Sequence, residues 1–313
     1  MAEKILVTGA NGQIGTVLCE ELRRIYGKEQ VLASDIKRQS TDNEPYIFLD
    51  ILNEQRLREV IDDHGITQVY HLTAILSANG EWNPMKTWNI NLNGLLSILN
   101  LAKEHHIKKI FFPSTIAVFG NTTPKIDTAQ DVPLLPETVY GISKVAGEMW
   151  CNYYHKRYDV DVRSLRYPGI ISHQSIPSGG TTDYAVEIFH GIIKDNHYDC
   201  FLKADTALPM MYIPDSIRAT IELMEAPADS ITVRTSYNLS AMSFTPAQIF
   251  EEIKKQYPKA TINYKPDFRQ EIAEGWSSSI NDSEARRDWN WQHEYDLKAL
   301  TEDMIKNIKP KYQ

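Results

Sequence analysis

The feature that most constrains the fold of this chain is a glycine-rich segment near its start. Residues 8–15 read Thr-Gly-Ala-Asn-Gly-Gln-Ile-Gly, and an apolar run at residues 5–7 comes directly before them. Apolar residues then recur at the spacing of an amphipathic helix, at Ile14, Val17, Leu18, Leu22 and Ile25. A strand, a tight glycine turn and a helix in this order predict a βαβ unit whose helix N-terminus can bind an anionic group.

Short apolar runs and helical patterns alternate through the first half of the chain. Strands that are joined by helices pair in parallel, through right-handed crossovers. This pattern predicts an α/β fold with a doubly wound parallel sheet of the Rossmann type. The expected strands span residues 4–7, 30–34, 46–49, 68–72, 109–113 and 160–166.

Two long helical segments are expected at residues 88–106 and 139–158. The first is apolar around much of its circumference, with Leu95, Leu96 and Ile98 on different sides. Such a helix either lies deep in the protein or buries a second face against a partner. The pattern leaves both interpretations open.

After Arg166 the sequence becomes irregular. Residues 168–180 are rich in Gly, Ser and Pro and have no periodicity, which predicts a loop. We expect a first domain over residues 1–168, rejoined by part of 212–242, and a smaller α/β C-terminal lobe over residues 169–313 that binds substrate. The elements expected there are helices at 183–195, 215–225, 246–256, 283–291 and 297–308, and strands at 236–239 and 261–264.

Composition excludes several classes of protein. With 33 Lys and Arg against 41 Asp and Glu, the net charge is −8, which disfavours general nucleic-acid binding. Cys19, Cys151 and Cys200 form no metal-binding or disulfide pattern, and we interpret His71 as a core histidine. No apolar run reaches the roughly 18 residues of a membrane span, and no targeting segment precedes the first strand. We therefore expect a soluble, cytoplasmic protein with no metal, nucleic-acid or membrane partner.

The glycine turn and the strand that follows it predict a dinucleotide site. The first glycine permits the tight turn, the second lets the backbone approach a pyrophosphate, and the third lets helix and strand pack closely. Asp35 ends the second expected strand, where a carboxylate can accept hydrogen bonds from a ribose diol. Because it would repel a 2′-phosphate, NAD is favoured over NADP, although Lys37 and Arg38 could partly offset this repulsion. The expected cofactor contacts are Gly9, Asn11, Gly12, Gln13, Ile14, Gly15, Asp35, Asp50, Ile51, Leu72, Thr73 and Ala74.

A candidate catalytic pair lies at residues 140–144, Tyr-Gly-Ile-Ser-Lys, which places Tyr140 and Lys144 on one helix face. A phenol with a pKa of about 10 is a poor base at neutral pH. A neighbouring lysine cation and a positive nicotinamide would both favour the phenolate and lower this pKa. Ser114 and Thr115 end the preceding strand, and the hydroxyl of either could orient a substrate oxygen.

Together these motifs resemble the extended short-chain dehydrogenase/reductase superfamily, to which UDP-galactose 4-epimerase belongs. The resemblance spans roughly residues 1–170, and Phe119 departs from the tyrosine that is usual at its position. It implies NAD as the cofactor, with Asn91, Tyr140, Lys144 and Tyr167 among the residues that contact it. The matching motifs are the glycine turn, Asp35, Asp50-Ile51, Asn91, residues 114–120 and Tyr140-x-x-x-Lys144.

The second half is similar to one family within this superfamily, the short-chain type of L-threonine 3-dehydrogenase. This implies NAD-dependent oxidation of the L-threonine side-chain alcohol to 2-amino-3-ketobutyrate, with Tyr140 as general base and hydride passed to NAD⁺. Lys144 would lower the pKa of Tyr140, and Ser114 or Thr115 would orient the hydroxyl. The zinc-dependent enzymes of the same activity would need clustered cysteines. The similar segments are residues 166–172, 179–186, 208–213, Trp276, 279–283 and 286–291.

The charged ends of an amino acid need partners in the second half. Residues 179–183 offer backbone N–H groups and hydroxyls at a helix start, and Asp183 could face the ammonium group. Thr-Thr-Asp before a helix is also an ordinary N-cap, and Trp276 either closes over the site or packs in the core. The loop 172–180 is typical of a lid that substrate and NAD would protect from proteolysis. The expected substrate contacts are Ser77, Ser114, Tyr140, Gly180, Thr181, Thr182, Asp183 and Trp276.

Two other functions stay open. A sugar-nucleotide epimerase or dehydratase would use the same cofactor and the same Tyr and Lys, although the expected Asn is missing after Arg166-Tyr167. A non-catalytic NAD-sensing protein often lacks the Tyr or the Lys, and both are present here. The family resemblance further implies a homodimer with a four-helix interface formed by residues 88–106 and 139–158.

Overall fold

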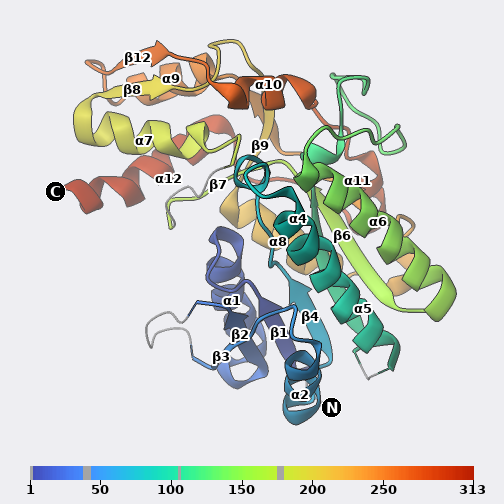
Figure 1. Cartoon of the computed structure of the whole chain (residues 1–313). Helices are drawn as coiled ribbons and strands as arrows, with labels where there is room; N and C mark the ends of the chain where they lie inside the picture. Colours follow the sequence, from blue (N-terminus) through green and yellow to red (C-terminus); the bar gives the residue numbers. More distant parts are fainter. Residues whose placement is uncertain (1–2, 38–43, 105–106, 175–179) are drawn as a thin grey trace.

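The computed structural model describes residues 3–37, 44–104, 107–174 and 180–313, and its centre is a sheet of seven parallel strands (Figure 1). The strand order is β10-β6-β5-β4-β1-β2-β3, so β1 pairs with β2 on one side and with β4 on the other. This confirms the predicted doubly wound sheet. The strands are β1 Ile5–Thr8, β2 Val31–Asp35, β3 Tyr46–Phe48, β4 Gln68–His71, β5 Lys109–Thr115, β6 Asp161–Tyr167 and β10 Tyr237–Asn238.

Helices cover both faces of this sheet and create two apolar cores. One core includes Leu18 of α1 and Ile217 of α8. The other includes Leu57 of α2, Leu99 of α5 and Cys151 of α6. The helices are α1 Gln13–Tyr26, α2 Glu54–His64, α5 Gly94–Glu104, α6 Val139–Tyr158 and α8 Ile213–Glu225.

The segment expected as one helix over 88–106 begins earlier and is interrupted. It consists of α4 (Pro84–Trp88), a π-helical turn (Asn89–Asn93) and α5, while the short helix α3 (Ser77–Gly80) precedes it. Most apolar side chains of α5 are buried within the chain, so the protein's own core covers most of its apolar surface. The neighbouring helix α6, which runs beside α5 in Figure 1, carries the exposed apolar side chains instead: Ile142, Met149, Trp150 and Tyr153.

The second half of the chain forms a smaller α/β lobe, as predicted, at the top of Figure 1. It contains a parallel strand pair, β12-β8, and a three-stranded sheet, β11-β9-β7. Between α8 and this lobe's last helices the chain returns to the main sheet, where β10 pairs with Leu165 and Arg166. The remaining elements are β7 Gly169–Ile171, β8 His197–Cys200, β9 Leu208–Tyr212, β11 Met242–Phe244, β12 Thr261–Tyr264, α7 Tyr184–Asp195, α9 Pro246–Lys254, α10 Phe268–Gly275, α11 Ser283–Trp289 and α12 Leu297–Ile308.

The prediction of a loop over residues 168–180 was wrong at its start, because Gly169–Ile171 form β7. Pro168 and Gly169 have the composition of a turn, but the strand is stabilised by pairing with β9, far away in the chain. Strands β8, β9 and β11 and helix α10 were also not expected. Short strands that pair with distant partners leave little local pattern in the sequence.

Within the described residues, no helix has both the length and the apolar character of a membrane span. The same part of the chain holds no group of three or more His, Cys, Asp or Glu side chains that could bind a metal ion. His71 is a core histidine, as expected: its Nδ1 lies 2.9 Å from the Thr8 hydroxyl, and burial lowers its pKa to about 3. It is therefore neutral at physiological pH.

Candidate active site

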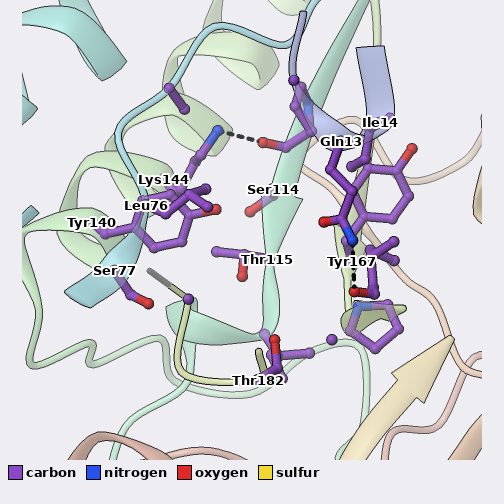
Figure 2. A pocket seen from close by; sticks show the side chains of 18 of the residues that line it. Gln13, Ile14, Leu76, Ser77, Ser114, Thr115, Tyr140, Lys144, Tyr167 and Thr182 are labelled. Atoms are coloured by element: carbon purple, nitrogen blue, oxygen red, sulfur yellow. Dashed lines mark hydrogen bonds between the residues drawn. The ribbon is translucent and has the colours of Figure 1, made fainter. Parts of the chain in front are cut away.

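A cavity of about 260 Å³ opens where β1, β4, β5 and β6 end (Figure 2). Open α/β sheets bind ligands at this edge, beside the point where the strand order reverses. The cavity joins the glycine turn and the first turns of α6 to segments of the C-terminal lobe. Its lining residues are Gly9, Gly12, Gln13, Ile14, Gly15, Leu72, Ala74, Leu76, Ser77, Pro113, Ser114, Thr115, Ile116, Tyr140, Lys144, Tyr167, Pro168, Gly169, Ile170, Gly180, Thr181, Thr182, Asp183 and Trp276.

The three glycines of the turn meet steric demands of different strength. Gly9 has a φ of +70°, a conformation that side chains disfavour, and a Cβ there would lie 2.8 Å from the Thr73 amide nitrogen. A Cβ on Gly15 would lie 2.3 Å from the Gly9 carbonyl oxygen, so helix and turn pack as closely as glycine allows. Gly12, which precedes α1, meets only that same carbonyl, at 3.3 Å. The turn thus leaves open backbone at a helix N-terminus, which fits a pyrophosphate.

Asp35 lies at the end of β2, beside the glycine turn. Its carboxylate accepts hydrogen bonds from the backbone N–H groups of Asn11 and Lys37, both at 3.2 Å. The Asn11 side-chain amide donates to the Lys37 carbonyl at 2.7 Å. Asp35 lies next to the glycine turn, which contains Asn11, but neither residue lines the cavity. Arg38 lies outside the described residues.

Asn91 binds the backbone that leads away from β4. Its side-chain oxygen accepts from the Ile75 N–H at 2.8 Å, and its amide nitrogen donates to the Ile75 carbonyl at 3.0 Å and to the Ser143 hydroxyl at 3.2 Å. Asn91 thereby fixes the Leu72–Leu76 segment against α6 from behind the cavity wall. Asp50, Ile51 and Thr73 do not line the cavity either.

Tyr140 and Lys144 both line the cavity, from one face of α6 (Figure 2). The Lys144 ammonium nitrogen donates to the Pro113 carbonyl at 2.7 Å and lies 5.7 Å from the centre of the Tyr140 ring. The Thr115 side chain lies beside Tyr140 in the cavity, where its hydroxyl favours the phenolate form. Helix α6 begins here because the Thr138 side chain caps it, accepting from the Gly141 N–H at 3.1 Å.

Burial governs the ionisation of this pair. It raises the pKa of Tyr140 to about 12, although the Thr115 hydroxyl acts in the opposite direction. It lowers the pKa of Lys144 to about 7, against the attraction of Cys151 and Glu148. The loss of solvation is thus the largest effect on the Tyr140 phenol, and the protein alone does not produce the low tyrosine pKa that the Tyr-x-x-x-Lys spacing led us to expect.

Ser114 and Thr115 have different partners. The Ser114 hydroxyl donates to the buried Glu148 carboxylate at 2.5 Å, whereas Thr115 contacts Tyr140. Arg166 completes this arrangement with two hydrogen bonds to Glu148, at 3.0 and 2.8 Å. Of the two hydroxyls that the sequence left as alternatives, Thr115 therefore stands nearer to Tyr140.

The opposite wall of the cavity comes from the C-terminal lobe, which meets Ser77 of α3 there. The hydroxyls of Ser77 and Thr181 lie 3.3 Å apart, and the Asp183 carboxylate accepts from the Gly180 N–H at 2.7 Å. Asp183 does not cap α7 with its side chain, so Thr-Thr-Asp is not the ordinary N-cap that was the alternative interpretation. Trp276 is buried and lines the cavity. Of the expected lid over 172–180, residues 175–179 lie outside the described residues.

Six lining residues were not expected from the sequence. Pro113 and Ile116 flank the two hydroxyl residues at the end of β5, so their position in the chain was a usable signal. Pro168, Gly169 and Ile170 reach the cavity only because β7 pairs with β9, and the sixth residue is Leu76. The Gln13 side chain donates to the Ile170 carbonyl at 3.3 Å and so connects the glycine turn to this segment (Figure 2).

Comparison with known proteins agrees with this arrangement. A protein from Bos taurus named "L-threonine 3-dehydrogenase, mitochondrial" is 46% identical over 307 residues, which cover 97% of this chain and 82% of the bovine one. A structure named "GalE-like L-Threonine dehydrogenase from Cupriavidus necator (holo form)" is 53% identical, with a TM-score of 0.96 and coverage of 97% and 99%. A structure named "Monomeric L-threonine 3-dehydrogenase from metagenome database (apo form)" is 46% identical, with a TM-score of 0.96 and coverage of 99% and 100%.

The family model that matches this chain spans the parallel sheet, the glycine turn and the Tyr140–Lys144 pair. It is described as the NAD dependent epimerase/dehydratase family and matches residues 5–240. The chain belongs to this family, the extended short-chain dehydrogenases/reductases.

Proposed function

We propose that this protein oxidises the side-chain alcohol of L-threonine to 2-amino-3-ketobutyrate with NAD⁺ as the oxidant. One observation carries the proposal: a glycine turn suited to a dinucleotide and the Tyr140–Lys144–Thr115 group line the same small cavity. The similarity to proteins named L-threonine dehydrogenase over nearly the whole chain supports threonine as the substrate.

The residues around the turn fit NAD. Gly9, Gly12 and Gly15 leave no side chain between the backbone and a pyrophosphate, and Asp35 offers a carboxylate to a ribose diol. Asp50, Ile51, Leu72, Thr73, Ala74 and Tyr167 are proposed to surround the rest of the cofactor. When bound, NAD⁺ supplies the hydride acceptor.

The proton chemistry falls to the side chains of α6 and β5. Tyr140 accepts the proton of the threonine hydroxyl, and Thr115 orients that hydroxyl by a hydrogen bond. Because burial raises the pKa of Tyr140 to about 12, the phenolate needs positive charge nearby. Lys144 supplies this charge when protonated, and the bound oxidised cofactor adds to it.

The charged ends of threonine are proposed to bind between Ser77 and the segment 180–183. The hydroxyls of Ser77 and Thr181, with Gly180 and Thr182, face the carboxylate, and Asp183 attracts the ammonium group. Trp276 covers the substrate. These groups lie on both sides of the cavity, so substrate would contact the two parts of the chain at once.

The experiment is a spectrophotometric assay with purified protein, NAD⁺ and L-threonine. We expect NADH absorbance to rise with the wild type, and Tyr140→Phe to lower kcat by about 10³-fold or more while NADH binding and circular dichroism stay unchanged. Absence of NADH formation with threonine from neutral to alkaline pH would refute the proposal. UDP-hexoses tested in parallel would reveal a sugar-nucleotide enzyme.

Domain organisation and assembly are further parts of the proposal. We propose that residues 1–168, with part of 212–242, form the NAD-binding domain and that 169–313 form the substrate lobe. We also propose a homodimer through α5 and α6, because α6 exposes Met149, Trp150 and Tyr153. One related structure is named as monomeric, so light scattering during gel filtration decides between the two states.

The three buried free cysteines fit a cytoplasmic location.

A further inference from the structure

Three consecutive residues at the end of β5 contact three residues of α6 that are spaced four apart. The Pro113 carbonyl accepts from Lys144 at 2.7 Å, the Ser114 hydroxyl donates to Glu148 at 2.5 Å, and the Thr115 side chain lies beside Tyr140. Residues four apart share one helix face, so these contacts form a single row between strand and helix. In Figure 2 the labelled members of this row, Ser114, Thr115, Tyr140 and Lys144, lie together in the cavity.

Glu148 is the fully buried end of this row. Its two oxygens accept the Arg166 Nε and Nη2 hydrogen bonds at 3.0 and 2.8 Å, and Arg166 is itself buried. The remaining Arg166 nitrogen, Nη1, donates to the Gln130 carbonyl at 3.0 Å and to the Asn238 side chain at 3.1 Å. The carboxylate is thus held in place by β6, and Ser114 is its donor from β5.

We propose that Glu148 is a positioning residue for the reaction: held by Arg166, it binds the Ser114 hydroxyl and so fixes the end of β5 against α6, with Pro113 facing Lys144 and Thr115 facing Tyr140. This inference rests on the proposed function of the same cavity. It gives Ser114 a role that differs from contact with substrate, because its hydroxyl is engaged by Glu148.

The charge of Glu148 acts on the same site. The groups that face Lys144 are Tyr140, Glu148 and Cys151 on α6 and His71 on β4, while β5 presents the Phe112 ring and the Pro113 carbonyl. Glu148 favours the ammonium form, and burial disfavours it. Loss of the carboxylate charge would therefore lower the pKa of Lys144. As the pH is raised, the variant would then lose activity at a lower pH than the wild type does.

The opposing explanation is that Glu148 and Arg166 only stabilise the fold. A matched control exists on β6, the strand that carries Arg166. There Asp161 binds Arg163 at 2.8 Å and Arg234 at 2.7 Å, far from the cavity. Asp161→Asn also leaves an arginine without its carboxylate. We expect this variant to lower the stability of the fold but to keep the kcat of the wild type.

The test uses Glu148→Gln, Ser114→Ala, their combination and Asp161→Asn, with two independent measurements. Amide hydrogen exchange without substrate reports the order of residues 113–118. Steady-state kinetics with L-threonine and NAD⁺ across pH reports the reaction. If Glu148→Gln does not fold, the double variant with Glu148→Met and Arg166→Met is measured in its place, because it removes both buried charges.

We expect Glu148→Gln to speed exchange in residues 113–118 roughly tenfold and to lower kcat about tenfold or more. The alkaline limb of its pH profile should shift to lower pH. Ser114→Ala should lower kcat less, and it should add less than about twofold in the Glu148→Gln background, because both changes break the same contact. Asp161→Asn should change neither measurement.

Wild-type kcat and exchange in Glu148→Gln or in the paired methionine variant would overturn the proposal. Effects of Ser114→Ala and Glu148→Gln that multiply independently would also overturn it, because Ser114 would then act by another route. If the wild type fails to oxidise threonine, the proposed function falls. The exchange measurement alone then decides whether Glu148 orders the end of β5.

Discussion

The two walls of the cavity are built in different ways. The wall formed by the glycine turn, the end of β5 and the start of α6 consists of the ends of regular elements in the parallel sheet. The wall formed by Tyr167–Ile170, Gly180–Asp183 and Trp276 consists of segments that are distant in the sequence, and Gly169–Ile171 are held there by pairing with β9. The comparison teaches that the proposed proton and cofactor chemistry would rest on the ends of regular elements, whereas the proposed substrate recognition would rest on contacts between distant segments.

The first wall is expected to govern kcat, and Thr115→Val tests this most directly. Removing the hydroxyl beside Tyr140 raises the pKa of the phenol further, so kcat should fall by roughly 100-fold. The loss should be the same at every pH below the pKa of the phenol. Steady-state kinetics from neutral to alkaline pH measures it, with NADH affinity as the control. A kcat within about twofold of the wild type would mean that Thr115 does not act through Tyr140.

Gly15→Ala tests the backbone geometry of the same wall. A Cβ 2.3 Å from the Gly9 carbonyl oxygen forces the helix away from the turn, which should cost roughly 1–3 kcal/mol of unfolding free energy. NADH affinity should fall roughly tenfold, as measured by fluorescence titration. Gly12→Ala is the milder comparison, because its Cβ meets that oxygen at 3.3 Å. Wild-type affinity in Gly15→Ala would show that this close packing is dispensable for binding.

Asp183→Asn tests the second wall. The asparagine oxygen can still accept the Gly180 N–H, so the substitution removes the charge while keeping the turn. The KM for threonine should rise about tenfold, with kcat and NADH affinity within about twofold of the wild type. If KM does not change, another group binds the ammonium.

The last test concerns stability rather than catalysis and uses His71, which contacts the Thr8 hydroxyl at the end of β1. Its pKa falls from 6.5 to about 3 on folding, so the unfolded chain binds more protons between these values. Its contribution to stability is complete above about pH 6.5 and is lost as pH falls toward 3, by up to about 1.4 kcal/mol per pH unit. Urea unfolding of the wild type and His71→Gln between pH 7 and pH 5 measures the difference. Parallel curves would contradict it.

The same contrast explains how much of the structure could be predicted from the sequence. Helices α6 and α12 and strand β12 have the expected bounds, because periodicity and caps such as Thr138 are local signals. Strand β7 was missed because its stability comes from pairing with β9 rather than from its own residues.

The candidate site divides in the same manner. The glycine turn, Tyr140 and Lys144 could be placed in one cavity because strand ends and helix spacing fix their positions. The partner of Ser114 could not be predicted, since Glu148 looks like any helical carboxylate until β6 brings Arg166 beside it. The raised pKa of Tyr140 was also unexpected, because burial is a property of the whole fold.

The π-helical turn at Asn89–Asn93 has a consequence for how the chain tolerates insertions and deletions. Asn91 sits in this widened turn and binds the Ile75 backbone through both ends of its amide. Deleting one residue there would restore an ordinary helix and remove the bulge that presents Asn91. Asn91 would then lose its contact with the segment after β4. A loop can change its length over evolution, but this helical stretch has a length that the contact between Asn91 and Ile75 requires.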